Sequence, residues 1–146
     1  MIVYLDTSAL VKRYIQETGT DDVVALVAEA EAVGSVVLTR AEIASALGKA
    51  ARLEWLEHPD AVKAWKDFLL HWPSFTRIGI TPLLIERASQ LSWEYGLRAY
   101  DAVHLAASLI WQETLDTSIV LTVYDRELWA AGQEAGLSVW PENMVP

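Results

Sequence analysis

The sequence contains no cysteine. This absence excludes disulfide bonds, a thiolate nucleophile and zinc held by cysteine, and it fits a reducing compartment. Long hydrophobic runs are missing as well. Asp6 interrupts the opening MIVYL, and no later stretch is long enough to cross a bilayer. The sequence therefore predicts a protein without a secretory signal or membrane span, and we expect it in the cytoplasm.

Positive charge is also scarce, with 11 Lys and Arg against 20 Asp and Glu and a formal net charge of −9. This balance excludes a broad basic surface for nucleic acid, so any such contact must be local or bridged by a metal ion. Two common catalytic signatures are absent. There is no G-x-S-x-G motif, and Gly48-Lys49 lacks the upstream glycine of a phosphate-binding loop.

The composition is that of a globular protein, with 53% hydrophobic and 21% charged residues in 146 positions. Apolar stretches of strand length alternate with segments of helical periodicity, such as Leu84, Ala88 and Leu91. The predicted strands are 1–5, 34–38, 76–80, 118–124 and an edge strand at 137–140. This pattern predicts an α/β fold with a central, mostly parallel sheet of four to five strands and helices on both faces.

The chain is long enough for one domain, and we expect residues 1–146 to form it. Residues 39–73 are rich in helical patterns but contain no intervening strand, so they predict a projecting pair of helices. The chain has seven Trp. Core packing is the expected role of most of them, although aromatic side chains on a projecting pair would also suit an interface.

Four acids lie in apolar surroundings, where an ionised carboxylate is costly without a partner. Asp6 ends IVYLD, Glu42 lies in TRAEIASAL, Asp101 lies in LRAYDAVHLAAS, and Asp125 closes IVLTVYD. In a parallel sheet, strand ends and the helix starts that follow them meet at one edge, where such folds bind ligands. Carboxylates gathered there favour one or two Mg²⁺ or Mn²⁺ ions. We therefore expect a metal site.

Each of these acids also has a simpler structural interpretation. Glu42 completes a capping box with Thr39, Asp125 is placed to cap the next helix, and Asp101 lies near a helix start. His104 could share the helix face of Asp101 and approach a metal, but a hydrogen-bonded structural histidine is the favoured interpretation.

Basic residues follow or precede the acids and could contact a phosphodiester. For each of them alone, ordinary solvated helix surface is the competing interpretation. The candidate RNA-binding residues are Arg13, Arg40, Lys49, Arg98 and Arg126.

The four acidic motifs, taken in order, resemble the PIN-domain ribonucleases, and most closely the VapC-like toxins of type II toxin–antitoxin pairs. The resemblance covers nearly the whole chain, and LRAYDAVHLAAS is its most specific segment. It implies metal ligands at Asp6, Asp101 and Asp125. It also implies that Glu42 ligates directly or through water, or acts as the base.

The resemblance further implies supporting hydroxyls at Thr7 and Ser8, metal-dependent hydrolysis of RNA, a homodimer and a small antitoxin. We expect the antitoxin to contact residues 39–73. One position departs from the family. Members often carry Ser or Thr two residues before the last acid, where this chain has Val123, with Thr122 one residue earlier.

The sequence thus predicts an Mg²⁺- or Mn²⁺-dependent endoribonuclease of a toxin–antitoxin pair. An alternative is a non-catalytic module of the same fold that binds RNA with the help of a metal. A nuclease acting on DNA or flap structures is disfavoured by the short chain.

Overall fold

The computed structural model describes residues 1–144 and contains a five-stranded sheet in the order β3-β2-β1-β4-β5. All neighbouring strands are parallel, with Tyr4 opposite Gly34 on one side and opposite Leu121 on the other. The predicted α/β fold with a mostly parallel sheet is confirmed. The strands are β1 (Ile2–Leu5), β2 (Ala32–Val36), β3 (Thr76–Ile78), β4 (Val120–Thr122) and β5 (Ser138–Trp140).

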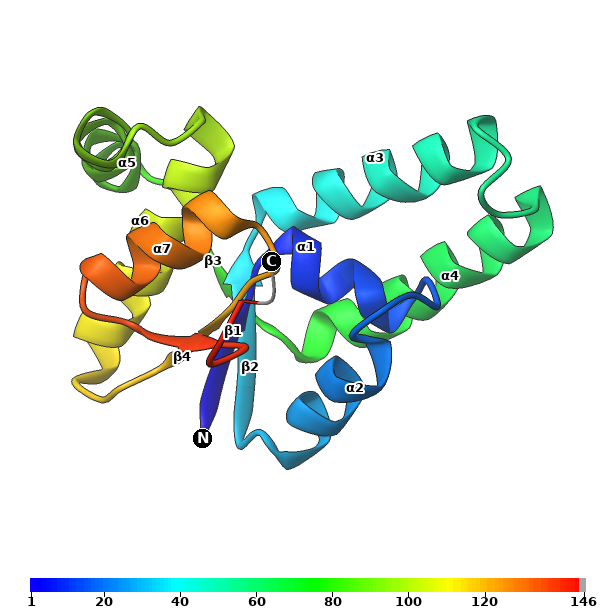
Figure 1. Ribbon diagram of the computed structural model, residues 1–146, viewed down its shortest axis with the longest axis horizontal. Helices are drawn as coiled ribbons and strands as arrows, with labels where there is room; N and C mark the ends of the chain where they lie inside the picture. Colours follow the sequence, from blue (N-terminus) through cyan, green and yellow to red (C-terminus); the bar gives the residue numbers. More distant parts are fainter. Residues whose placement is uncertain (145–146) are drawn as a thin grey trace.

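Helices cover both faces of the sheet, as predicted, because each crossover between parallel strands must pass over one face. Figure 1 shows α5, α6 and α7 grouped on one side and α3 and α4 extending from the other. The helices are α1 (Thr7–Leu10), α2 (Thr20–Glu29), α3 (Leu38–Arg52), α4 (His58–His71), α5 (Pro82–Tyr95), α6 (Ala99–Leu115) and α7 (Arg126–Glu134), with short 3₁₀ segments η1 (Val11–Arg13) and η2 (Trp72–Ser74).

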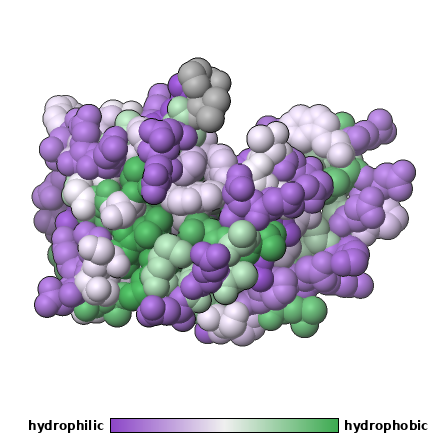
Figure 2. Space-filling view, turned by 60° about the horizontal axis from the view of Figure 1, so that its bottom comes forward, coloured by the Kyte–Doolittle hydropathy of each residue, from purple (hydrophilic) through white to green (hydrophobic). Residues whose placement is uncertain are grey.

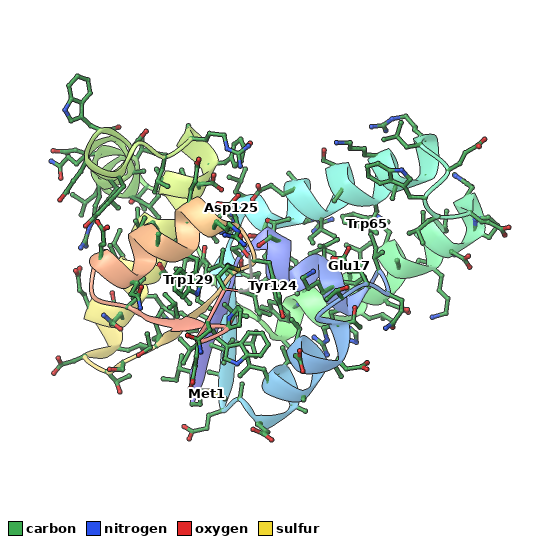
Figure 3. The ribbon with its side chains drawn as sticks, viewed as in Figure 1. Met1, Glu17, Trp65, Tyr124, Asp125 and Trp129 are labelled. Atoms are coloured by element: carbon green, nitrogen blue, oxygen red, sulfur yellow. The ribbon has the colours of Figure 1, made fainter. Side chains whose placement is uncertain are left out.

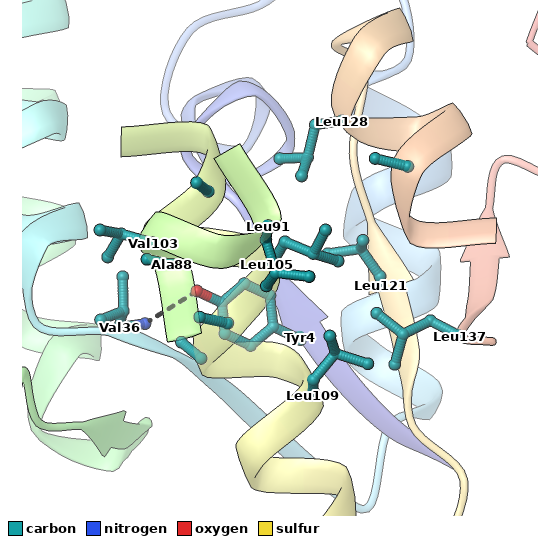
Figure 4. Close-up of a cluster of buried hydrophobic side chains, with 14 of the residues drawn as sticks. Tyr4, Val36, Ala88, Leu91, Val103, Leu105, Leu109, Leu121, Leu128 and Leu137 are labelled. Atoms are coloured by element: carbon teal, nitrogen blue, oxygen red, sulfur yellow. Dashed lines mark hydrogen bonds between the residues drawn. The ribbon is translucent and has the colours of Figure 1, made fainter. Parts of the chain in front are cut away.

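Two hydrophobic clusters follow from the alternation of side chains along the central strand β1. Tyr4 points into the cluster formed with α5, α6 and α7 (Figure 4), whereas Val3 and Leu5 point into the cluster formed with α1 to α4. All three side chains are fully buried. The continuous apolar run of β1 is therefore explained by burial on both faces.

The second cluster continues into the helical pair α3–α4, which pack against each other. Phe68 of α4 is fully buried, with the ring of Trp65 at 5.4 Å and that of Trp72 at 5.2 Å. Core packing, as expected, accounts for Trp72, but Trp55 and Trp93 are 67% and 93% exposed. These two tryptophans contribute surface rather than core.

Local signals set several helix ends. Pro82 begins α5 after the cap residue Thr81, whose side chain accepts a hydrogen bond from the Leu84 backbone N–H. Gly96 ends that helix in the left-handed conformation, at a φ of 67°. Gly34 has a different role. A Cβ there would lie 2.6 Å from the Trp111 ring, so only glycine lets α6 pack this closely on β2.

Within residues 1–144, no helix is long and apolar enough to cross a membrane.

Candidate active site at the carboxyl edge of the sheet

Asp6 and Asp125 lie at the same edge because each follows one of two neighbouring parallel strands. Asp6 comes directly after β1 and caps α1, accepting the Ala9 N–H at 3.0 Å. Asp125 follows β4 and caps α7, accepting the Leu128 N–H at 3.0 Å. The predicted capping role of Asp125 is confirmed, and Figure 3 shows this residue beside Tyr124 at the start of α7.

A serine hydroxyl connects the two strand ends. Ser8 Oγ donates to Asp6 Oδ1 at 2.7 Å and accepts the backbone N–H of Tyr124 at 2.8 Å. The Asp6 backbone N–H in turn donates to the Thr122 carbonyl at 3.1 Å. Asp6 is therefore held firmly, with its position fixed relative to Asp125.

Burial makes Asp6 an unusual carboxyl. Its side chain is buried, and loss of solvation raises its pKa to about 6 despite the opposing charge of His104 and the hydrogen bond from Ser8. The positive charge and hydrogen bonds that the protein supplies therefore do not make up for the solvation that the ionised Asp6 carboxylate loses. A buried carboxylate in this condition is a natural ligand for a cation.

Asp101 and Asp125 share one arginine. Arg98 Nε lies 3.2 Å from Asp101 Oδ2, and its Nη2 lies 3.4 Å from Asp125 Oδ2. Desolvation, followed by the charge of Asp125, raises the pKa of Asp101, and Arg98 only partly opposes this rise. Two carboxylates therefore meet here and repel each other. The arginine that offsets the repulsion is itself 59% exposed at its side chain.

Glu42 joins the site through α3. Its Oε1 accepts the Thr7 hydroxyl at 2.9 Å and lies 2.7 Å from His104 Nε2. The predicted capping box is wrong. The helix begins at Leu38 without a side-chain cap, and the Thr39 hydroxyl pairs instead with Ser35 Oγ at 2.7 Å. Because α3 starts two residues earlier than the capping box requires, Glu42 is free to face the site.

Two residues of this network, Tyr4 and His104, were not predicted as site residues. Tyr4 Oη lies 2.8 Å from His104 Nδ1, and both side chains are almost completely buried. The expectation that His104 is a hydrogen-bonded structural histidine agrees with these contacts. The sequence signal for this pair was Tyr4 in the apolar run of β1, because a buried Tyr hydroxyl requires a hydrogen-bond partner.

The candidate RNA-binding residues are distributed unevenly. Arg98 is paired with two of the acids, and Arg40 is exposed two residues before Glu42. Lys49 lies farther along α3, with its ammonium 5.7 Å from the centre of the Trp55 ring. Arg13 lies in η1, near His71. Desolvation and, to a smaller extent, the charge of Arg13 lower the pKa of His71.

Arg126 is exposed at the first position of α7, directly after Asp125. At the departure from the family pattern, Val123 is fully buried in the first hydrophobic cluster. Thr122 Oγ1 is buried without a hydrogen-bond partner within residues 1–144. Neither residue therefore supports Asp125 with a hydroxyl, and Arg98 and the α7 backbone hold this acid instead.

The donor chemistry fits a hard divalent cation, although residues 1–144 contain no compact cluster of three or more acids or histidines that could hold one as they stand. The candidate donors are carboxylate oxygens, which Mg²⁺ and Mn²⁺ prefer. Two of them, Asp6 and Asp101, have pKa values raised by burial. Arg98 supplies the positive charge between Asp101 and Asp125, so a cation there would take over its role.

The fold and this acidic edge define a class of α/β proteins with a carboxylate site at the ends of adjoining strands. Residues 3–128 match the PIN domain family, and the chain belongs to that family. The resemblance seen in the four acidic motifs is thereby confirmed.

Two full-length relatives come from Mycobacterium tuberculosis, Ribonuclease VapC45 of strain CDC 1551 / Oshkosh and Ribonuclease VapC49 of strain H37Rv. Each is 35% identical to this chain over 148 residues, and the match covers 99% of this chain and 99% of the relative. Among solved structures, PAE2754 from Pyrobaculum aerophilum is 26% identical, with a TM-score of 0.63, and the match covers 94% of this chain and 83% of that one.

A further solved structure, VapBC2 from Rickettsia felis bound to a DNA fragment from its promoter, has a TM-score of 0.62 at 13% identity. The match covers 95% of this chain and 97% of that one. This likeness shows the fold alone.

Proposed function

We propose that this PIN-domain protein is a metal-dependent endoribonuclease that hydrolyses RNA phosphodiester bonds as the toxin of a toxin–antitoxin pair. One observation carries the proposal. Four acids from separate segments are held at the carboxyl edge of the sheet in three groups: Ser8 binds Asp6, Thr7 and His104 bind Glu42, and Arg98 pairs with both Asp101 and Asp125. The names of the relatives, both ribonucleases, support the choice of RNA.

In this mechanism, Asp6, Asp101 and Asp125 would hold one or two Mg²⁺ or Mn²⁺ ions, and Glu42 would ligate through water or act as the base. Such an ion would supply an activated water and offset the charge that grows on the phosphate. Ser8 fixes the orientation of Asp6 by donating to one of its oxygens. The Arg98 side chain is 59% exposed, so it would turn toward solvent when a cation lay between the acids.

The exposed cations provide the local contact that the net charge of −9 requires. Arg98, once released, together with Arg40 and Arg126, lies within two or three residues in sequence of an acid of the site. We expect these three side chains to contact phosphates on either side of the scissile bond. Arg13 and Lys49 extend the proposed RNA path beyond the site.

Incubation with a panel of single-stranded and structured RNAs, with and without Mg²⁺ or Mn²⁺, tests the proposal. Wild-type protein is expected to cut RNA only with the metal, and Asp6→Asn and Asp101→Asn to lose the activity. Asp60→Asn, an exposed acid on α4, is the matched control and should cut normally. Equal cleavage by wild type and the two site variants would refute the metal site.

The net charge of −9 favours one alternative, a non-catalytic module that binds RNA through the metal. The same RNA panel separates the two functions. Metal-dependent binding without any product would assign the module, whereas turnover assigns the enzyme.

We also propose that an antitoxin binds the pair α3–α4. A cavity of about 270 Å³ lies between these helices and is lined mainly by apolar side chains such as Leu47, Val62 and Trp65. An amphipathic segment of the antitoxin would fit there. Co-expression with the product of the neighbouring reading frame, followed by co-purification of α3–α4 variants, tests this contact. Retained co-purification by Val62→Asp would contradict it.

The proposed assembly is a homodimer of single-domain chains (1–146) in the cytoplasm. Figure 2 shows hydrophobic surface interrupting the hydrophilic side chains on one face. Leu70, Leu83 and Trp93 are 77%, 72% and 93% exposed, and a second copy of the chain would cover such side chains. Light scattering coupled to size-exclusion chromatography should return twice the mass of 16.3 kDa. A monomer mass at high concentration would argue against the dimer.

A further inference from the structure

A buried chain of hydrogen bonds runs from the backbone of β2 to the carboxylate of Glu42. The Val36 N–H donates to Tyr4 Oη at 3.3 Å (Figure 4), and Tyr4 Oη lies 2.8 Å from His104 Nδ1. On the other side of the ring, His104 Nε2 lies 2.7 Å from Glu42 Oε1. The chain thus connects the hydrophobic interior with one acid of the site.

The donors and acceptors along this chain assign the histidine tautomer. The carboxylate of Glu42 can only accept, so His104 Nε2 carries the proton that is donated to it. In this tautomer Nδ1 is the bare nitrogen and accepts from Tyr4 Oη, which in turn accepts from the backbone N–H of Val36. Every member of the hydrogen-bond chain is satisfied in this arrangement.

This chain of hydrogen bonds also fixes which oxygen of Glu42 accepts hydrogen bonds from the protein. Thr7 and His104 both donate to Oε1, and no hydrogen bond reaches Oε2 from the residues that the structure describes. Thr7 directly follows Asp6, so the same oxygen ties Glu42 to the segment that holds Asp6. Oε2 is left for a water or another ligand.

We propose that Tyr4 and His104 are positioning residues that hold Glu42 by Oε1 and present Oε2 to the water used in RNA hydrolysis. The inference rests on the proposed nuclease function. It assigns to His104 a role through Glu42, not as a metal ligand. The His104 ring is hydrogen-bonded at both nitrogens, to Tyr4 at Nδ1 and to Glu42 at Nε2. It also packs edge-on against the Tyr4 ring, with 5.9 Å between the ring centroids. It therefore orients Glu42 as part of the rigid core.

The first test needs no activity. Nitrogen-15 NMR of the histidine rings in metal-free protein reports which nitrogen carries the proton, and the spectrum of His104→Gln assigns the His104 signals. We expect a ring protonated at Nε2 and hydrogen-bonded at Nδ1. A ring protonated at Nδ1 alone would overturn the proposal, because it could not donate to Glu42.

The second test uses kinetics and a graded pair of substitutions. A Gln side chain places its amide near the position of Nε2 and keeps a donor for Glu42, whereas Asn reaches only to the level of Nδ1. We expect His104→Asn and Tyr4→Phe to lower kcat about 10- to 100-fold with little change in KM, the usual range for groups that orient a ligand. His104→Gln should recover about tenfold relative to Asn.

A second Tyr–His pair in the same chain provides the matched control. Tyr14 Oη lies 2.9 Å from His71 Nδ1, outside the site. Tyr14→Phe removes the same kind of hydrogen bond and should leave kcat unchanged. Urea unfolding of each variant confirms that it is folded under assay conditions. If all folded variants cleave like wild type, the positioning role is refuted while the nuclease function stands. If wild type does not cleave, the nuclease function itself fails, and the NMR result still decides the tautomer.

Discussion

Replacing Asp6 by Asn is expected to stabilise the metal-free protein at neutral and alkaline pH. The substitution keeps the shape and the helix cap, because Asn accepts the Ala9 N–H as Asp does. Ser8 can still donate to the amide oxygen. What the substitution removes is a negative charge at a position that is only 4% exposed.

The magnitude follows from the pKa of Asp6. Burial raises this pKa from 3.8 to about 6, so the folded protein holds a proton that the unfolded chain has already released between these values. The stability of the wild type therefore falls as the pH rises from about 4 to about 6, by about 3 kcal/mol in total. Asn has no such dependence. The variant should match the wild type near pH 3.5 and exceed it by up to about 3 kcal/mol at pH 8.

Urea unfolding in EDTA at the two pH values measures the difference. Saturating Mg²⁺ should then raise the stability of the wild type at pH 8 and that of the variant much less, since binding to the folded state alone stabilises it. Asp60→Asn, which replaces an exposed acid, serves as the control and should change stability by no more than about 1 kcal/mol. A stability difference that is the same at both pH values, or a less stable variant at pH 8, would refute the reasoning.

Three further changes test other parts of the structure. Arg98→Ala removes the cation between Asp101 and Asp125, so Mn²⁺ binding followed by calorimetry should tighten severalfold; weaker binding would mean that Arg98 does not compete with the metal. Phe68→Ala should lower the free energy of unfolding by about 3–5 kcal/mol in urea, because a fully buried ring is lost. Gly34→Ala should destabilise by about 1–3 kcal/mol, since its Cβ would collide with a tryptophan ring, whereas Gly79→Ala, with no atom within 4 Å of the added carbon, should not; equal melting curves for the two would contradict this packing.

The sequence was informative where local chemistry alone sets the structure. The apolar run before Asp6 predicted a buried strand, and the alternation of such runs with helical patterns predicted the parallel sheet. The same order placed Asp6 and Asp125 at one edge, because parallel strands end together. Pro82 and Gly96 lie at the two ends of α5, where their effects depend on their own backbone and not on distant contacts.

Other features of the site depended on partners far away in the sequence. Thr39 fitted a capping box, but its hydroxyl bonds Ser35, and α3 begins at Leu38. His104 lies 62 positions from Glu42 and 100 from Tyr4, and no local pattern connects them. The exposure of Trp93 could not be read from its neighbours either, because helical spacing does not reveal which face another element covers.

By itself, then, the sequence predicted the α/β class, the parallel strands whose ends meet at one edge, and the four candidate carboxylates, because periodicity and strand-to-helix connections are local. Only the tertiary structure decided how those acids are held. Burial raised the pKa values of Asp6 and Asp101, Arg98 came to lie between Asp101 and Asp125, and Glu42 was fixed by a histidine from another helix. Solvation and hydrogen-bond partners are set by packing between distant segments, and such packing exists only in the folded chain.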